Sequence, residues 1–150
     1  MKLYEFKVAL DHDKKIYRII RILGNQTLDT LHNIIFAAFN REEEHLYSFY
    51  MTKKATKSYN TRYKAPEYTS DYSGFSTASI FDPGRKSGSA KEIIDALQLK
   101  ENDVFYYLFD FGDSWWHEVT LLSIAETDNA KGYPKIVKKA GRSPKQYPEF

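Results

Sequence analysis

The sequence predicts a single α+β domain in which two helices cover one largely antiparallel sheet. The chain has 150 residues, which is about the modal size of one domain. Strand-like and helix-like segments follow one another in the order ββαβαββ, so that strands and helices are mixed rather than strictly alternating. The chain is 42% hydrophobic and has only 7 Gly and 5 Pro, which argues against disordered, collagenous and low-complexity classes.

The first two strand-like segments predict a β-hairpin. In residues 4–10, apolar side chains alternate with Glu5 and Lys7, a pattern typical of a strand with one face in water. The turn-prone residues 11–14 follow, and residues 16–23 are then mainly apolar and β-branched. We therefore expect two antiparallel strands joined by a short turn.

Two segments have helical periodicity. In residues 27–40 the apolar side chains recur every three and four positions, and Thr27 is placed to act as the N-cap. A second helix is expected over residues 89–99, where Ser89 and Glu92 have the spacing of a capping box.

The rest of the chain is predicted as four strands and one irregular stretch. The expected strands are 45–51, 104–111, 115–124 and the short edge strand 134–137. Between about residues 52 and 87 no periodicity is clear, and a loop of that length inside a domain is usually functional or mobile.

The composition also narrows the class of protein. The absence of cysteine excludes a disulfide framework, a thiol nucleophile and zinc sites built on sulfur. No apolar run reaches the roughly 18 residues that a membrane span needs, and the first residues alternate instead of forming an apolar block. We therefore expect a cytoplasmic protein without a signal peptide or a transmembrane helix.

Positive charge is concentrated in two segments, although the net charge is only +2. Residues 52–66 contain no acid, and their basic side chains are interleaved with Tyr59 and Tyr63. Residues 131–145 form a second acid-free run. Lysines beside aromatic rings suit a nucleic-acid backbone and its unstacked bases. The residues expected to contact nucleic acid or an acidic partner are Lys53, Lys54, Lys57, Arg62, Lys64, Lys138, Lys139 and Arg142.

This charge pattern has a plainer interpretation. Solvated loops commonly carry lysine, and tyrosines in a long loop often hold that loop against the core. No ribonucleoprotein octamer, Gly-x-x-Gly clamp or paired Cys and His signature occurs.

The densest group of chemically active side chains lies in residues 109–118. If Gly112 and Asp113 form a two-residue turn, Asp110 faces Trp115 and becomes a diagonal neighbour of His117. A carboxylate beside an imidazole raises the imidazole pKa and fixes its tautomer, as a general base requires. The candidate catalytic residues are Asp110, Asp113, His117 and Glu118.

Alternatively, this group is structural. Asp110 and Asp113 can cap the turn by accepting hydrogen bonds from its amides, while Trp115 belongs to the core and His117 is a satisfied buried partner.

A ligand site would need histidines that are distant in the sequence to converge. The candidate ligand-binding residues are Trp115, His32 and His45. No histidine has the i, i+4 partner of a helical zinc site, and we expect no metal. A metal site of His32, His45 and His117 with Asp110 or Glu118 would be possible only if the fold brought these residues together. We also expect no cofactor.

Several short motifs resemble the plasmid Ri ORF-three-like family. They are Lys15-Ile-Tyr-Arg18, Thr27-Leu-Asp-Thr-Leu-His32, Ala37-Ala-Phe39, His45-Leu-Tyr-Ser-Phe49 and, most specifically, Tyr107-Leu-Phe-Asp-Phe-Gly-Asp-Ser-Trp-Trp-His-Glu118. The resemblance extends from about residue 3 to 148. It implies one α+β domain, found on plasmids, near mobile elements and in prokaryotic chromosomes, with no settled biochemical activity.

The chain departs from that family at two places. Trp116 stands where the family usually has an acid, so a site that needs this carboxylate would lack it here. The C-terminal residues 141–148 also replace the usual Pro-Pro-Glu-Asp stretch and its paired glycines.

Three functions remain open from the sequence. The first is a non-catalytic binding domain that contacts nucleic acid or an acidic partner through its basic, Tyr-rich segments. The second is an enzyme or metal-binding protein centred on the Asp110–Glu118 hairpin. The third is a homotypic interaction module that uses exposed aromatic residues.

Overall fold

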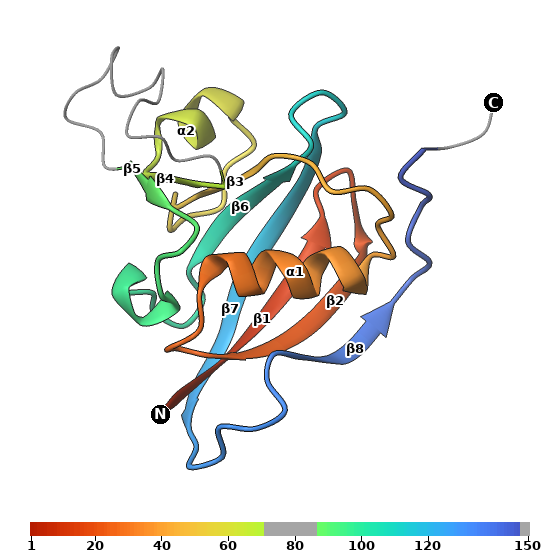
Figure 1. Cartoon of the computed structure of the whole chain (residues 1–150). Helices are drawn as coiled ribbons and strands as arrows, with labels where there is room; N and C mark the ends of the chain where they lie inside the picture. The colour runs from red at the N-terminus through yellow and green to blue at the C-terminus, as the bar shows by residue number, and fades with distance from the viewer. Residues whose placement is uncertain (71–86, 148–150) are drawn as a thin grey trace.

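The described residues of the computed structural model, 1–70 and 87–147, form one sheet with a helix on each face (Figure 1). The elements are β1 (Lys2–Leu10), β2 (Asp13–Leu23), α1 (Leu28–Ala38), β3 (Tyr47–Tyr50), α2 (Tyr59–Lys64), β4 (Glu67–Thr69), β5 (Ser87–Ser89), the 3₁₀ helix η1 (Ile94–Leu97), β6 (Val104–Phe109), β7 (Trp115–Glu126) and β8 (Lys135–Ala140). The strand order is β5-β4-β3-β6-β7-β1-β2-β8. Among these neighbours only β4 and β5 are parallel, so the predicted α+β class with a largely antiparallel sheet is confirmed.

The β1–β2 hairpin forms as its alternating pattern predicts. Tyr4, Phe6 and Val8 are buried on the face that α1 covers, while Glu5 and Lys7 point to the other face and are half-buried. Because side chains alternate between faces along a strand, the register of β1 decides which residues can meet solvent.

The α1 helix packs its apolar stripe on the sheet. The Thr27 side chain accepts a hydrogen bond from the backbone N–H of Thr30 at 3.1 Å, which confirms Thr27 as the N-cap. The buried positions of the helix are Leu28, Leu31, His32, Ile35 and Ala38. The main apolar core therefore lies between α1 and the sheet.

The prediction of a helix over residues 89–99 is wrong. Only η1 is helical there; residues 90–92 form a turn, and Ile93 is extended and bridges to Thr27. The carbonyl groups of Ala90 and Glu92 accept hydrogen bonds from the N–H groups of Asp29 and Leu28, in the first turn of α1. An α-helix at 89–99 would turn these carbonyl groups along its own axis, so satisfying the start of α1 keeps this segment from forming an α-helix.

The stretch expected to be irregular contains regular elements. The short α2, β4 and β5 lie within residues 59–89. Each is only three to six residues long, too short for hydrophobic periodicity to reveal. Residues 71–86, nearly the whole second half of that stretch, lie outside the described residues.

The β6–β7 connection differs from the predicted two-residue turn. Phe109 pairs with Trp115, which leaves the five residues 110–114 between the strands. Asp110 and Ser114 have φ values of 62° and 55°, in the left-handed region where Asp is better tolerated than most residues. The register is therefore shifted by one residue from the one that the sequence suggested.

The last strand, β8, is an edge strand as expected. Among the described strands it pairs only with β2, and Pro134 lies just before it. Within the described residues no helix is long and apolar enough to cross a membrane.

Candidate functional site

Residues 52–66 form a cap over the sheet face opposite α1. Five buried side chains of the cap and the sheet make an apolar cluster separate from the main core: Tyr50, Ala65, Tyr106, Leu108 and Trp116. The ring of Tyr59 stacks on Trp116 with centroids 5.6 Å apart, and Tyr63 meets Trp116 edge-on at 5.5 Å. These tyrosines thus attach the basic segment to the sheet, as the plainer interpretation of the sequence expects.

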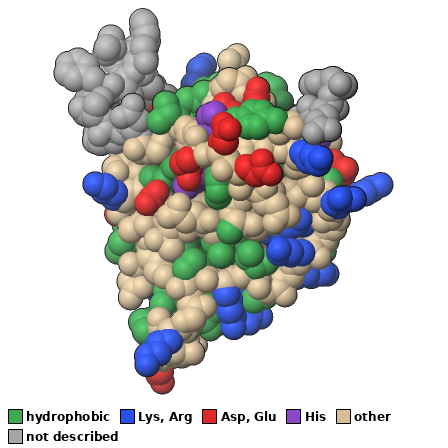
Figure 2. Space-filling view, turned by 45° about the vertical axis from the view of Figure 1, so that its right-hand side comes forward, with side chains coloured by type: hydrophobic (Ala, Val, Ile, Leu, Met, Phe, Trp, Pro, Cys, Tyr) green, Lys and Arg blue, Asp and Glu red, His purple; other side chains and the backbone are tan. Residues whose placement is uncertain are grey.

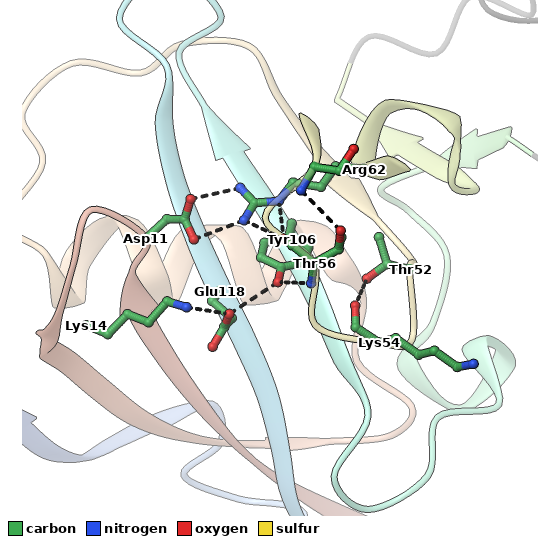
Figure 3. A network of polar contacts seen from close by, with 9 residues as sticks. Asp11, Lys14, Thr52, Lys54, Thr56, Arg62, Tyr106 and Glu118 are labelled. Atoms are coloured by element: carbon green, nitrogen blue, oxygen red, sulfur yellow. Dashed lines mark hydrogen bonds and ion pairs between the residues drawn. The ribbon is translucent and has the colours of Figure 1, made fainter. Parts of the chain in front are cut away.

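Arg62 anchors the cap and is unavailable to a partner. Its side chain is buried and makes two hydrogen bonds to the Asp11 carboxylate, at 2.8 and 3.1 Å (Figure 3). It also donates to the backbone oxygen of Thr56 and lies 3.7 Å from the Tyr106 ring centroid. Burial acts to lower the pKa of Arg62, but Asp11 outweighs it and the net shift is upward. The expectation that Arg62 contacts nucleic acid is therefore wrong.

The other predicted cations of the cap are exposed: Lys53, Lys54, Lys57 and Lys64. Lys54 and Lys57 flank Thr56, whose backbone N–H donates to Tyr106 Oη at 2.8 Å, so this part of the cap lies over the sheet. Lys53 instead reaches toward the backbone oxygen of Gln98, 3.5 Å away, beyond the end of η1.

The second basic run divides between the two faces of the sheet. Lys138 pairs in register with Ile19, and its ammonium lies 5.5 Å from the ring centroid of Tyr17 on the cap side. The neighbouring Lys139 pairs with Arg18, whose guanidinium donates to the last turn of α1 at the oxygen of Ala38. Lys139 is therefore on the α1 side, because adjacent residues of a strand point to opposite faces.

Arg142 also lies away from the cap side. It is exposed and lines a small pocket with Asn40, Glu42 and Gln146, beside the end of α1. The eight predicted contact residues thus do not form one surface.

A basic surface does form on the cap side, from a partly different set of residues. We call it the basic face, and it comprises Lys7, Tyr17, Arg21, Lys135 and Lys138 on β1, β2 and β8. The cap, which carries Lys54 and Lys57, lies on the same side of the sheet, over β6. The ammonium of Lys7 lies 4.5 Å from the Tyr17 ring centroid. The alternation in residues 4–10 already placed Lys7 on the polar side of the first strand. The sequence could not show that β8 lies beside β2, which brings Lys135 and Lys138 to the same side of the sheet.

The carboxylates nearest to the basic face are already paired. Glu5 binds Arg21 at 3.0 Å, and Glu118 binds Lys14 at 2.9 Å. Among the described residues no carboxylate forms an ion pair with Lys7, Lys135 or Lys138. The net charge of this face is therefore positive.

The proposed Asp110–His117 pair does not form in the described structure. With the observed register, His117 stands opposite Tyr107, and Asp110 lies beyond the end of β6. Oδ1 of Asp110 accepts hydrogen bonds from the N–H groups of Gly112 and Asp113, at 3.1 and 3.3 Å. Asp110 thus caps the turn, which is the structural alternative considered from the sequence.

His117 is instead paired with Arg41, a residue that the sequence did not single out. His117 is fully buried, and its Nε2 accepts a hydrogen bond from Arg41 Nη2 at 3.1 Å. Its Nδ1 lies 3.2 Å from the backbone oxygen of Tyr107 and can donate to it. Burial lowers the pKa of His117 well below its ordinary value, and the charge of Arg41 lowers it further. The ring is therefore neutral near pH 7.

Arg41 is a buried cation held mainly by aromatic rings. Its guanidinium carbon lies 5.5, 5.2 and 4.9 Å from the ring centroids of Phe39, Phe109 and Trp115. Nε and Nη1 of Arg41 and Nε1 of Trp115 have no hydrogen-bond partner among the described residues. Burial lowers the pKa of Arg41 to about 10, so it remains charged at neutral pH.

The other candidate residues of the hairpin are divided between the two faces. Trp115 is half-buried on the α1 side, beneath Arg41. Glu118 points to the cap side, where it binds Lys14 and accepts from Tyr106 (Figure 3). Asp113 is exposed in the turn. Trp116 also points to the cap side, so an acid at that position would not face His117.

Two of the other histidines lie near the hairpin but serve different partners. His32 is buried, with Nδ1 2.5 Å from Tyr107 Oη and Nε2 2.5 Å from Glu44 Oε1. His45 lies 2.6 Å from Tyr147 Oη and 3.5 Å from an Asp110 oxygen. The structure thus brings His32 and His117 to the same tyrosine, one at its hydroxyl and the other at its backbone oxygen.

Burial lowers the pKa of His32 even though Glu44 opposes that shift. The Tyr107 hydroxyl keeps its proton, because complete burial raises its pKa well above the usual value. A neutral His32 that accepts from Tyr107 at Nδ1 and donates to Glu44 from Nε2 satisfies all three groups.

These side chains do not make a metal centre. Within residues 1–70 and 87–147, no group of three or more His, Cys, Asp or Glu side chains is arranged to hold a metal ion. Figure 2 shows histidine and acidic side chains gathered on one part of the surface, while many lysines and arginines lie elsewhere in that view.

Comparison with known proteins supports the fold and the family. A search of the curated proteins found no match. Among solved structures, a protein of unknown function from Methanosarcina mazei Go1 is similar, with 22% sequence identity and a TM-score of 0.72. The similarity covers 97% of this chain and 72% of that protein. A family model described as plasmid pRiA4b ORF-3-like protein matches residues 2–147, and the chain therefore belongs to the plasmid pRiA4b ORF-3-like family.

Proposed function

We propose that this protein is a non-catalytic module that binds single-stranded nucleic acid across the basic face. The observation that carries the proposal is that lysines distant in the sequence share one side of the sheet. Lys54 and Lys57 come from the cap, Lys7 from the first strand and Lys138 from the last.

The spacing of these cations suits a phosphate backbone. Neighbouring strands lie about 4.8 Å apart, so the step from β1 across β2 to β8 separates Lys7 from Lys138 by roughly 10 Å. A span of roughly 10 Å covers about three phosphates at the axial spacing of about 3.4 Å per strand, and lysines without a carboxylate partner are free to replace condensed counterions.

Aromatic side chains on the same side of the sheet could contact bases. Tyr17 is half-buried between Lys7 and Lys138, while Tyr59 and Tyr63 of the cap are 54% and 44% exposed. Exposed rings stack on unpaired bases without sequence preference, and this favours a single strand over a duplex.

In the cytoplasm, where we expect this protein to be, such a ligand would be available to it. An acidic protein is the alternative partner for the same face, and it differs in having no bases to stack. The hairpin gives less support to an enzyme, because His117 is neutral, buried and engaged by Arg41.

The test is a salt titration with fluorescent oligonucleotides. We expect single-stranded DNA or RNA to bind at about 50 mM salt, with an affinity that falls steeply as salt rises. The double variant Lys7→Gln/Lys138→Gln removes two cations and should make the slope of log K against log salt shallower by about 1.4. The matched control Lys91→Gln/Lys100→Gln neutralises two exposed lysines elsewhere and should leave the slope unchanged.

The outcomes separate the candidate partners. Absence of binding to any oligonucleotide at about 50 mM salt would exclude the nucleic-acid proposal. Equal binding of polyglutamate and oligonucleotides would instead indicate an acidic protein partner. Self-association in sedimentation experiments, abolished by changing Tyr59 and Tyr63, would indicate the homotypic module.

A further inference from the structure

The structure also contains a cleft that shares no residue with the basic face. It has a volume of about 630 Å³ and lies between α1 and the segment that leads into β3. Its polar lining includes Asp29, His32, Glu44, His45, Tyr47 and Ser70. This volume is within the range of small-molecule sites and is much larger than a single inorganic ion requires.

The lining of the cleft has a negative charge. It contains two carboxylates, from Asp29 and Glu44, and no lysine or arginine from the described part of the chain. Burial lowers the pKa of His32, so that this ring does not offset the carboxylates near neutral pH. A ligand with positive charge is the electrostatic complement of such a lining.

Both carboxylates are held in place by buried rings. Tyr47 donates from its hydroxyl to Asp29 Oδ1 at 2.5 Å, and His32 donates from Nε2 to Glu44 Oε1. The Tyr47 and His32 rings are stacked, with centroids 3.7 Å apart and an interplanar angle of 6°. Because the rings that hold them are in contact, the two carboxylates are positioned as a pair before any ligand arrives.

Each carboxylate has one oxygen that makes no hydrogen bond to the described part of the chain. Asp29 Oδ2 and Glu44 Oε2 have no hydrogen-bond partner within the described residues. Ionised oxygens of this kind accept charge-assisted hydrogen bonds from an ammonium or guanidinium group. Two such acceptors beside an aromatic pair favour a cation that carries several N–H donors.

We propose that this cleft binds a small organic cation, with an ammonium or guanidinium group held between Asp29 and Glu44. The rest of the ligand would occupy the cleft toward His45 and Ser70. A divalent metal is less well suited, because no group of three potential ligands is arranged for one among the described residues. The proposal does not depend on nucleic-acid binding, since it uses a different surface.

Isothermal titration calorimetry with spermidine and with agmatine, in the absence of nucleic acid and at low ionic strength, tests this proposal. We expect at least one of the two to bind the unchanged protein. The double variant Asp29→Asn/Glu44→Gln keeps an acceptor oxygen for Tyr47 and for His32 but removes both charges, and it should bind at least tenfold more weakly. The matched control Glu126→Gln/Asp128→Asn removes two exposed carboxylates outside the cleft and should bind like the unchanged protein.

A second variant covers the case in which the double variant fails to fold. Asn33 lines the cleft from an exposed position on α1, so Asn33→Lys places a competing ammonium there without disturbing the core. It should also lower the affinity at least tenfold. Wild-type affinity in a folded Asn33→Lys or Asp29→Asn/Glu44→Gln protein would overturn the proposal, as would binding of Mg²⁺ or Ca²⁺ alone with no binding of either organic cation. Unchanged oligonucleotide binding by these variants would show that the two sites are separate.

Discussion

Arg41 Nη2 lies 3.1 Å from His117 Nε2, and the two side chains are buried together. An arginine can only donate, so His117 must accept at Nε2 and carry its proton on Nδ1, where the backbone oxygen of Tyr107 receives it. This relationship decides what the hairpin can do. The imidazole is fixed as a neutral structural group, with neither a free lone pair nor a carboxylate beside it.

The first prediction concerns the pH dependence of stability. Burial lowers the pKa of His117 and of His32 in the folded protein. The unfolded chain therefore binds protons below about pH 6.5 that the folded chain does not, and the free energy of unfolding should decrease as pH falls, by up to about 1.4 kcal/mol per pH unit for each histidine. Urea unfolding between pH 5 and 8 measures this slope.

A variant identifies the source of the slope. His117→Gln retains a donor for Tyr107 and an acceptor for Arg41 but does not titrate, so it should make the slope shallower by the contribution of one histidine and leave that of His32. A wild-type slope in the His117→Gln protein would contradict a depressed pKa at that position.

The second prediction is that Arg62 contributes to stability rather than to partner binding. Arg62→Ala breaks a buried pair and leaves Asp11 without its partner, and we expect the free energy of unfolding to fall by about 3 kcal/mol. Lys57→Ala, in the same cap, should change it by less than about 0.5 kcal/mol, because Lys57 is exposed. Chemical denaturation compares the two variants, and equal stabilities would show that the cap does not depend on Arg62.

The third prediction concerns Asp110. Asp110→Ala removes the acceptor for two turn amides and places alanine at a φ of 62°, so we expect a loss of about 1–3 kcal/mol. Asp110→Asn keeps an acceptor oxygen and tolerates this backbone conformation, and it should cost less than about 1 kcal/mol. Thermal unfolding of both proteins measures the difference; an equal loss in both would mean that the carboxylate charge, rather than turn capping, is what matters.

The fourth prediction separates the observed 3₁₀ segment from the helix that the sequence suggested. Ile94 is fully buried, whereas Ile93 is 39% exposed. We expect Ile94→Ala to cost about 2–5 kcal/mol and Ile93→Ala less than about 1 kcal/mol. Comparable losses at the two positions, measured by denaturant unfolding, would argue against the extended entry to η1.

Local sequence patterns were sufficient to predict those elements whose conformation depends mainly on residues close together in the chain. The alternation of β1, the periodicity of α1 and the hydroxyl of Thr27 each act within a few residues, so the sequence alone predicted them correctly. The same holds for β8, because a proline at its start restricts it to a sheet edge.

The β6–β7 register and the non-helical conformation of residues 90–93 depended on tertiary partners. A shift of one residue in the turn separated Asp110 from His117. Hydrogen bonds to the first turn of α1 kept residues 90–93 from forming the expected helix. The sequence alone determined the fold class, the first hairpin, α1 and where positive charge is concentrated along the chain. Only the tertiary structure decided that Arg62 is buried, that Lys7 and Lys138 share a face and that His32 borders an acidic cleft, because each of these depends on contacts between residues far apart in the chain.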